Sequence, residues 1–341
     1  MNTKDMPMKN KLRQPKTLLQ IAIAGLASFA ISAYAATKWD LPAAYPASNL
    51  HTQNLEEFIK NVQEFSDGDF TITLHDNASL FKAPEIKRAV QGGQAEIGEI
   101  LLTNFANEDP IFALDGLPFL ATGYDAAWDL HLAQKEALND KLESQGMMLL
   151  YTVAWPPQGI YANEDIETIE DLKGLKWRAY SPVTARIAEL VEAQPVTIQS
   201  AELSQAMATG VVEAFMTSGS TGWDTKVYEY LKKYYDTQAW LPKNAVIVNK
   251  RAFDRLSDEN KKALLKAADI AEKEGWALSE KMTAWYLEQL EENGMEVLEP
   301  SDELMNGLSE VGEIMVQEWI DDAGDVGAEI IETFYQIQNE K

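Results

Sequence analysis

Short apolar strands alternate with amphipathic helices through most of this chain, and that alternation is the strongest constraint on its fold. Residues 52–65 carry apolar side chains at helical spacing, and residues 70–74 then alternate in β-forming residues as a strand does. The same patterns predict a helix at 84–91, strands at 96–101, 147–153 and 175–180, a helix opened by Ser181 and Pro182, a strand at 196–198, a helix at 200–208, and strands at 211–216 and 244–249. Long helices are predicted from Ser257 to about residue 293 and over about the last 40 residues. This order predicts an α/β fold with mostly parallel sheets covered by helices.

The first 35 residues have the three-part pattern of a secretory signal peptide. A basic leader precedes an apolar run from Leu18 to Ile31, and Ala33 and Ala35 occupy the two positions that a signal peptidase reads. The run is short for a membrane span, which needs about 20 apolar residues. We therefore expect cleavage after Ala35, export to the periplasm, and a mature chain that is not embedded in the membrane.

The charge of the chain excludes several classes of partner. Its formal net charge of −25 becomes −29 once a leader with five basic residues and one acidic residue is removed. Such an acidic chain is not expected to bind nucleic acid or an anionic membrane surface. The chain has no cysteine, so it has neither a disulfide nor a thiolate nucleophile.

No catalytic motif stands out in the sequence. The three histidines, His51, His75 and His131, have no partner at metal-ligand spacing, and the sequence contains no nucleophile elbow, dinucleotide-binding glycine motif or phosphate-binding P-loop. We therefore expect a protein that is not an enzyme and that holds neither a cofactor nor a metal.

Arg178 is the most informative polar residue. Of the five arginines that follow the leader, it is the one placed inside a predicted strand, between Trp177 and Ala179 and just before the helix opened by Ser181. Ligands of open α/β sheets bind outside the carboxyl ends of strands, and a guanidinium there can hold a carboxylate through two parallel hydrogen bonds. The alternative is a structural salt bridge to one of the many carboxylates of the chain.

Several segments, taken in order over about 300 residues, resemble motifs of the solute-binding proteins of TRAP transporters, the DctP family. They are Tyr45-Pro46 with His51 and Phe58, the run from Leu80 to Gly98, Asp115 to Leu120, Leu172 to Arg178, Gly210 to Ala214, and Asn249-Lys250 with Phe253 and Leu256-Ser257. One position departs from the family pattern, because Thr217 stands where many members carry a carboxylate-binding asparagine. This departure weakens the expectation of the usual C4-dicarboxylate geometry.

The resemblance implies a periplasmic-binding-protein-like fold, with two α/β lobes around a ligand cleft and a long helix that crosses both. We expect lobe I to comprise residues 36–155 plus 244–283, and lobe II residues 156–243 plus 284–341. The resemblance also implies that Arg178 forms the salt bridge to the ligand. The ligand then passes to the membrane permease subunits, which an ion gradient drives, and we expect the receptor to be a monomer.

The expected cleft is rich in aromatic residues and holds one arginine. A dicarboxylate needs a second cation, and the sequence places none there, so we expect a small organic acid with one carboxylate and an aromatic or hydrophobic body, such as an indole or phenyl acid. The expected ligand-binding residues are Arg178, Thr217, Trp155, Gln158, Phe215, Trp223, Tyr45, His51, Trp240 and Asn244.

Several alternatives for the ligand and for the role of the protein remain open. The ligand could be a C4-dicarboxylate or another carboxylate, a metal ion could bridge the ligand and Gln158, and the protein could serve a sensory receptor instead of a permease. An enzyme built on a binding-protein scaffold is a further alternative, which turnover in a purified sample would reveal.

Overall fold

The computed structural model describes residues 36–341, in which helices and strands are mixed along the chain. The signal peptide expected at residues 1–35 lies outside the described residues. Within residues 36–341, no helix is both long enough and apolar enough to cross a membrane.

Two sheets contain the strands from the first part of the described chain, and the larger of them also contains one late strand. In the larger one, β10 (Lys243–Asn249) lies between β3 (Ile97–Leu101) and β4 (Met147–Ala154) and is antiparallel to both. In the smaller one, β1 (Thr37–Pro42) and β2 (Phe70–His75) pair in parallel. Four helices pack against β2, β3, β4 and β10 respectively: α1 (Leu50–Phe65), α2 (Ala83–Gly92), α3 (Gly123–Ser144) and α7 (Lys250–Asp254).

The middle of the chain builds the other two sheets. The four-stranded sheet has the order β11-β9-β5-β8, and β6 pairs with β7 in parallel. The bounds of these strands are β5 (Gln158–Ala162), β6 (Lys176–Ala179), β7 (Gln194–Thr197), β8 (Phe215–Ser218), β9 (Lys233–Tyr235) and β11 (Glu296–Leu298). Three short helices connect them: α4 (Pro182–Leu190), α5 (Leu203–Ala208) and α6 (Gly219–Asp224).

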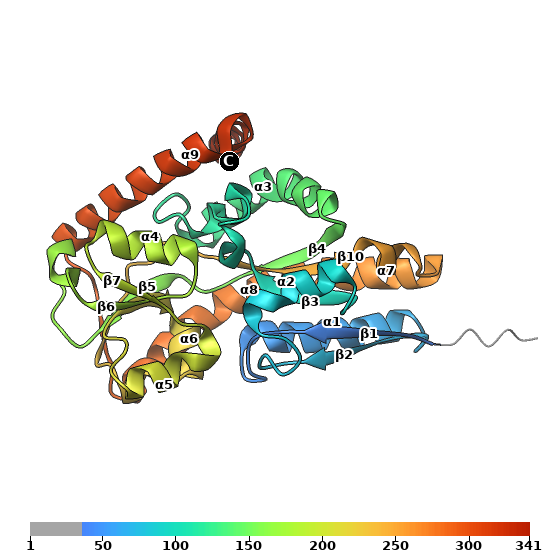
Figure 1. The fold of residues 1–341 in the computed structure, drawn as a ribbon, viewed down its shortest axis with the longest axis horizontal. Coiled ribbons are helices and arrows are strands. Elements are labelled where there is room, and N and C mark those ends of the chain that lie inside the picture. The colour runs from blue at the N-terminus through green and yellow to red at the C-terminus, as the bar shows by residue number, and fades with distance from the viewer. Residues whose placement is uncertain (1–35) are drawn as a thin grey trace, which may run out of the picture. The chain divides into compact units, whose positions relative to one another are not determined.

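Two long helices close the chain, as the sequence predicts. Helix α8 (Asp258–Glu292) packs against α1 and β4 along one part of its length and against α6 and β11 along another. Figure 1 shows α8 in orange, reaching from the blue α1 to the yellow α6. Helix α9 (Asp302–Asn339) packs against α3 and is interrupted at Gly324, whose backbone is not helical. A helix in contact with both sets of sheets can connect two lobes.

Local capping explains where several helices begin. The hydroxyl of Ser181 accepts a hydrogen bond from the backbone N–H of Thr184 at the start of α4, and Ser257 and Ser301 cap α8 and α9 in the same way. Such caps satisfy backbone donors that have no partner within the helix. The helix start predicted at Ser181 is therefore confirmed.

Two features expected from the sequence are wrong, the position of one strand and the direction of strand pairing. The strand expected at residues 211–216 is displaced, because Gly210 has a positive φ of 68° and the ordered strand β8 begins only at Phe215. The sheets are also less parallel than expected, since β10 and β5 run antiparallel to the strands beside them. The chain crosses from one set of sheets to the other just before each of these strands. Parallel pairing with a neighbouring strand needs a crossover connection, usually a helix, and none precedes β5 or β10.

Candidate functional site

A cavity of about 260 Å³ lies where several strands end. Leu101 ends β3, Trp155 follows β4, and Thr217 lies near the end of β8. Arg178 and Tyr180 stand at the end of β6, where open α/β sheets bind their ligands. The full lining is Ala44, Tyr45, Ala78, Lys82, Ala83, Pro84, Leu101, Trp155, Gln158, Arg178, Tyr180, Gln199, Ser200, Ala201, Glu202, Thr217, Thr221 and Pro242.

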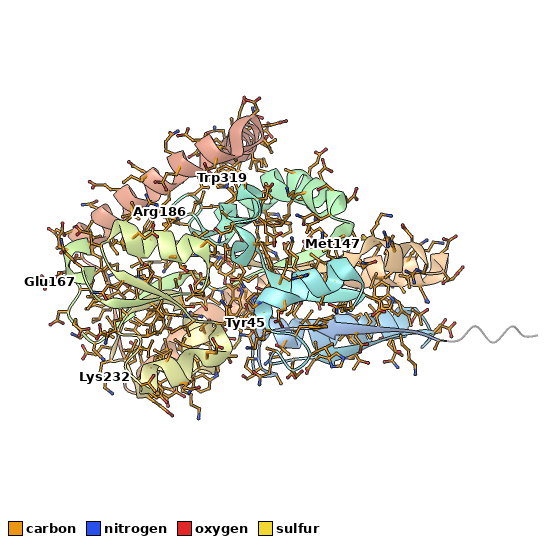
Figure 2. The ribbon with its side chains drawn as sticks, viewed as in Figure 1. Tyr45, Met147, Glu167, Arg186, Lys232 and Trp319 are labelled. Carbon is orange, nitrogen blue, oxygen red and sulfur yellow. The ribbon has the colours of Figure 1, made fainter. Side chains whose placement is uncertain are left out.

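Five of the ten residues expected at the site line this cavity: Tyr45, Trp155, Gln158, Arg178 and Thr217. They come from the loop after β1, the segment between β4 and β5, and strands β5, β6 and β8. Figure 2 shows Tyr45 in the middle of the view, between the blue elements β1 and α1 and the yellow helix α6. Their roles in binding a ligand stay a prediction.

The other five expected residues do not line the cavity. The ring of His51 packs behind Trp155 at a centroid distance of 4.2 Å, and Asn244 accepts a hydrogen bond from the indole N–H of Trp155. Phe215, the first residue of β8, stacks on Tyr161 of β5. Trp240 is 1% exposed within the largest core cluster, and Trp223 packs against Trp285. His51 and Asn244 therefore contact Trp155 of the cavity wall, and the rings of Phe215, Trp223 and Trp240 are used in packing.

Arg178 is a buried cation without an acidic partner. Its side chain is 2% exposed, its Nε donates to the carbonyl of Ile198 at 3.0 Å, and its guanidinium lies 5.0 Å from the ring centre of Tyr180. Its Nη1 has no hydrogen-bond partner among residues 36–341, and no carboxylate there lies within salt-bridge distance. Burial lowers the pKa of Arg178 to about 10, so the side chain remains charged at neutral pH. The structural salt bridge left open by the sequence is therefore absent from the described residues.

A second group of buried polar residues lies behind Tyr45 and Trp155. His51 and Glu99 are 0% and 3% exposed, and 3.7 Å separates His51 Nδ1 from Glu99 Oε1. Burial raises the pKa of Glu99 to about 7 and lowers the pKa of His51 to about 3, because burial disfavours the charged form of each group. Near pH 7, His51 is therefore neutral and Glu99 is partly protonated.

Sequence reasoning missed Tyr180 and the segment Gln199–Glu202. Tyr180 stands two residues after Arg178, and residues two apart in a strand share a face, so this spacing was a usable signal. Gln199–Glu202 leads into α5 from a short 3₁₀ turn and carries no comparable pattern.

Acidic and histidine side chains do not gather into a metal site in the described part of the chain. No group of three or more His, Cys, Asp or Glu residues within 36–341 is placed to hold an ion. The chemistry available in the cavity is instead that of one buried cation, several hydroxyl and amide groups, and aromatic walls.

Comparison with known proteins agrees with this geometry. The model of the DctP family, described as bacterial extracellular solute-binding protein, family 7, matches residues 43–322. A solved receptor from Bordetella pertussis, DctP6, which binds pyroglutamic acid, is 65% identical over 88% of this chain and all of its own, with a TM-score of 0.87. A TRAP solute-binding protein from a marine metagenome, specific for pyroglutamate, is 42% identical over 89% of this chain and all of its own, also with a TM-score of 0.87.

A periplasmic binding protein of Escherichia coli is also similar to this chain. The 2,3-diketo-L-gulonate-binding periplasmic protein YiaO of Escherichia coli is 27% identical over 82% of this chain and 86% of its own length. These relatives are solute receptors and not enzymes, and they confirm the expected two-lobed binding-protein fold. The chain therefore belongs to the DctP family, the solute-binding proteins of TRAP transporters that capture small organic acids.

Proposed function

We propose that this protein is the periplasmic receptor of a TRAP transporter for pyroglutamate, and that Arg178 holds the ligand carboxylate in a salt bridge. The observation that carries the proposal is Arg178, a buried charge in the cavity wall without an acidic partner among residues 36–341. An uncompensated buried charge costs several kcal/mol, so an anion that enters the cavity would supply the missing counter-charge.

The cavity favours an acid with one carboxylate. Its only other cationic side chain, among the residues that line it, is Lys82, which is exposed at the start of α2. A dicarboxylate would find no second buried cation for its other charge, and the acidic side chain of Glu202 also lines the cavity.

Solved relatives favour pyroglutamate over the aromatic acid that the sequence suggested. Three receptors at 65%, 42% and 40% identity are described as binding pyroglutamate or pyroglutamic acid. Pyroglutamate has one carboxylate on a small five-membered ring, which suits a cavity of about 260 Å³. The aromatic rings of Tyr45, Trp155 and Tyr180 would then pack against the apolar edge of that ring.

We further propose that residues 36–155 with 244–283, and 156–243 with 284–341, act as two lobes that close on the ligand. Tyr45 and Trp155 belong to the first set, and Arg178 and Thr217 to the second, so a bound ligand would touch both. After cleavage of residues 1–35 in the periplasm, the monomeric receptor would deliver pyroglutamate to the permease subunits. A permease gene beside this one would favour transport over a sensory role.

Thermal unfolding of the mature chain tests the ligand and the arginine together. A ligand at 100 times its Kd stabilises a protein by about 2.7 kcal/mol, and each kcal/mol raises Tm by roughly 2–4 °C at this size. We expect pyroglutamate to raise Tm clearly, and succinate and indole-3-acetate to have little effect. The rise should vanish in Arg178→Met.

A control variant and a measurement without ligand distinguish a loss of ligand binding from a loss of folding. Arg186→Met is the matched control, because Arg186 is half-exposed and pairs with Glu189 and Glu318 away from the cavity; it should keep the full response. Without ligand, Arg178→Met should unfold at the same or a higher temperature than the wild type, since it removes an uncompensated buried charge. A pyroglutamate response that persists in Arg178→Met would refute the salt bridge, and a response to indole-3-acetate alone would refute the ligand.

A further inference from the structure

This inference rests on the proposed function and concerns the part of pyroglutamate that is not its carboxylate. The ring of pyroglutamate contains a lactam, with an N–H donor and a C=O acceptor side by side. A site that held only the carboxylate would not distinguish this ring from other small cyclic acids, because the carboxylate is common to them. The cavity should therefore present one acceptor and one donor to the lactam.

Gln158 is held with its oxygen as an acceptor in the cavity wall. Its Nε2 donates to the backbone carbonyl of Pro156 at 2.8 Å, and a carbonyl can only accept. The orientation of the amide is thereby fixed, and its Oε1 accepts a hydrogen bond from the hydroxyl of Tyr180 at 3.2 Å. An amide oxygen has two lone pairs, so Oε1 can accept a second hydrogen bond from a ligand.

The side-chain amide of Asn244 is also fixed in orientation, but here the nitrogen is the group directed toward Tyr45. The indole N–H of Trp155, which can only donate, donates to Asn244 Oδ1 at 2.8 Å. The Asn244 amide nitrogen must therefore point to the other side, where it lies next to the Tyr45 hydroxyl and the Glu99 carboxyl and works to lower the pKa of each, against the larger effect of burial. This nitrogen is buried and makes no hydrogen bond to any residue among 36–341.

The position of Asn244 decides what the Tyr45 hydroxyl can do. Tyr45 lines the cavity, and a hydroxyl beside an amide donor can turn its own proton away from that donor and toward a ligand. Burial raises the pKa of Tyr45 well above its usual range, so the proton stays on the oxygen and remains available for donation. Tyr45 therefore offers a donor from the loop after β1, and Gln158 offers an acceptor from β5.

We propose that Gln158 and Tyr45 are the specificity-determining residues for the lactam: Gln158 Oε1 accepts its N–H, the Tyr45 hydroxyl donates to its C=O, and Asn244 is the positioning residue for Tyr45. The two residues belong to different lobes as assigned above, so the lactam joins them when the cleft closes. A lactone places a ring oxygen against Gln158 Oε1, which sets two acceptors against each other. A ring with neither group leaves both side chains without a ligand partner.

The test is isothermal titration calorimetry with three ligands on the mature chain. The ligands are pyroglutamate, its lactone analogue 5-oxotetrahydrofuran-2-carboxylate, and cyclopentanecarboxylate, which has no lactam. The wild type should bind the lactone at least tenfold more weakly than pyroglutamate, and cyclopentanecarboxylate more weakly still. This ligand series needs no variant, so it remains decisive if a variant does not fold.

Two variants then assign the two contacts. Tyr45→Phe should weaken pyroglutamate and the lactone by about ten- to one-hundredfold and leave cyclopentanecarboxylate unchanged, because only the first two carry the carbonyl. Gln158→Met should weaken pyroglutamate alone and so abolish the preference over the lactone. Asn244→Leu, as the positioning variant, should reproduce the pattern of Tyr45→Phe. Tyr228→Phe, a tyrosine outside the cavity lining, is the matched control and should change nothing.

The outcomes separate this inference from the proposed function. If the wild type does not bind pyroglutamate, the proposed function fails and this inference fails with it. If the wild type binds pyroglutamate and the lactone equally, or if Tyr45→Phe weakens all three ligands by the same factor, only the assignment of the lactam contacts is overturned.

Discussion

At the scale of single residues, the least usual environment is that of Glu99. It lies on β3 behind the cavity wall, and the groups around it, Tyr45, Tyr151, His51 and Asn244, are all neutral near pH 7. Burial raises its pKa to about 7 from an ordinary value of 4.5, and its Oε2 has no hydrogen-bond partner among residues 36–341. Between about pH 4.5 and 7, the folded protein therefore holds a proton on Glu99 that the unfolded chain releases.

This proton makes stability depend on pH in a defined direction. The contribution of Glu99 is fully present below about pH 4.5 and is lost as the pH rises through about 7. Each pKa unit corresponds to about 1.4 kcal/mol, so the free energy of unfolding should fall by roughly 3 kcal/mol across this window. Urea denaturation of Glu99→Gln should lack this part of the decline, whereas Glu313→Gln on the exposed face of α9 should keep it. Equal pH profiles for the wild type and Glu99→Gln would show that Glu99 titrates normally.

At the scale of elements, the register of β5 brings the cavity wall together. Gly159 lies opposite Thr217 in the antiparallel pair of β5 and β8, next to Gln158. A methyl group on Gly159 would lie 2.4 Å from the ring of Tyr234 and 2.5 Å from the backbone oxygen of Tyr235. The close approach of β5 and β9 therefore requires glycine at this position.

Gly159→Ala tests the packing of this sheet. We expect it to lower the free energy of unfolding by about 1–3 kcal/mol, as overpacking of a close-packed interior does. We also expect weaker pyroglutamate binding, because β5 cannot shift without moving Gln158. Gly92→Ala, at an exposed helical position with open space around it, is the matched control and should be neutral or slightly stabilising. Denaturation midpoints that are the same for both variants would mean that β5 and β9 can separate freely.

At the scale of the whole described unit, one carboxylate joins segments that are far apart in the sequence. Asp224, at the end of α6, accepts hydrogen bonds from Ser48 at 2.9 Å and from the Asn49 side chain at 2.7 Å. Asn49 also caps α1, since its side chain accepts from the backbone N–H of His51. Under the proposed lobe boundaries, these bonds connect the two lobes beside the cavity.

Asp224→Ala should therefore weaken ligand binding without touching the ligand. Loss of two charge-assisted hydrogen bonds removes part of the free energy that favours the closed lobes, and we expect Kd for pyroglutamate to rise about tenfold. Asp254→Ala removes an exposed ion pair with Lys250 inside α7 and should leave Kd unchanged. Calorimetry gives both constants, and the same Kd in Asp224→Ala and the wild type would mean that this contact does not favour closure.

Local patterns in the sequence were sufficient to predict most of the longer helices and strands. Periodicity and capping located α1, α4, α8 and α9 because these signals depend on neighbouring residues only. They misplaced β8 and overestimated parallel pairing, because the start of an ordered strand and its direction depend on partners elsewhere in the chain. The resemblance over most of the chain supplied the family and the two-lobed fold, which the family model and the solved relatives confirm.

The sequence by itself determined the family and the class of function, and it singled out Arg178 as an unusual strand arginine. Only the tertiary structure decided which aromatic residues face the cavity: Trp155 lines it and Trp240 is buried in the core. Both are apolar rings whose burial stabilises the fold equally well in either place, so composition could not distinguish them. Only the tertiary structure likewise showed that Arg178 has no acidic partner among residues 36–341. The chain has 54 acidic residues, and the fold decides which of them lie near Arg178.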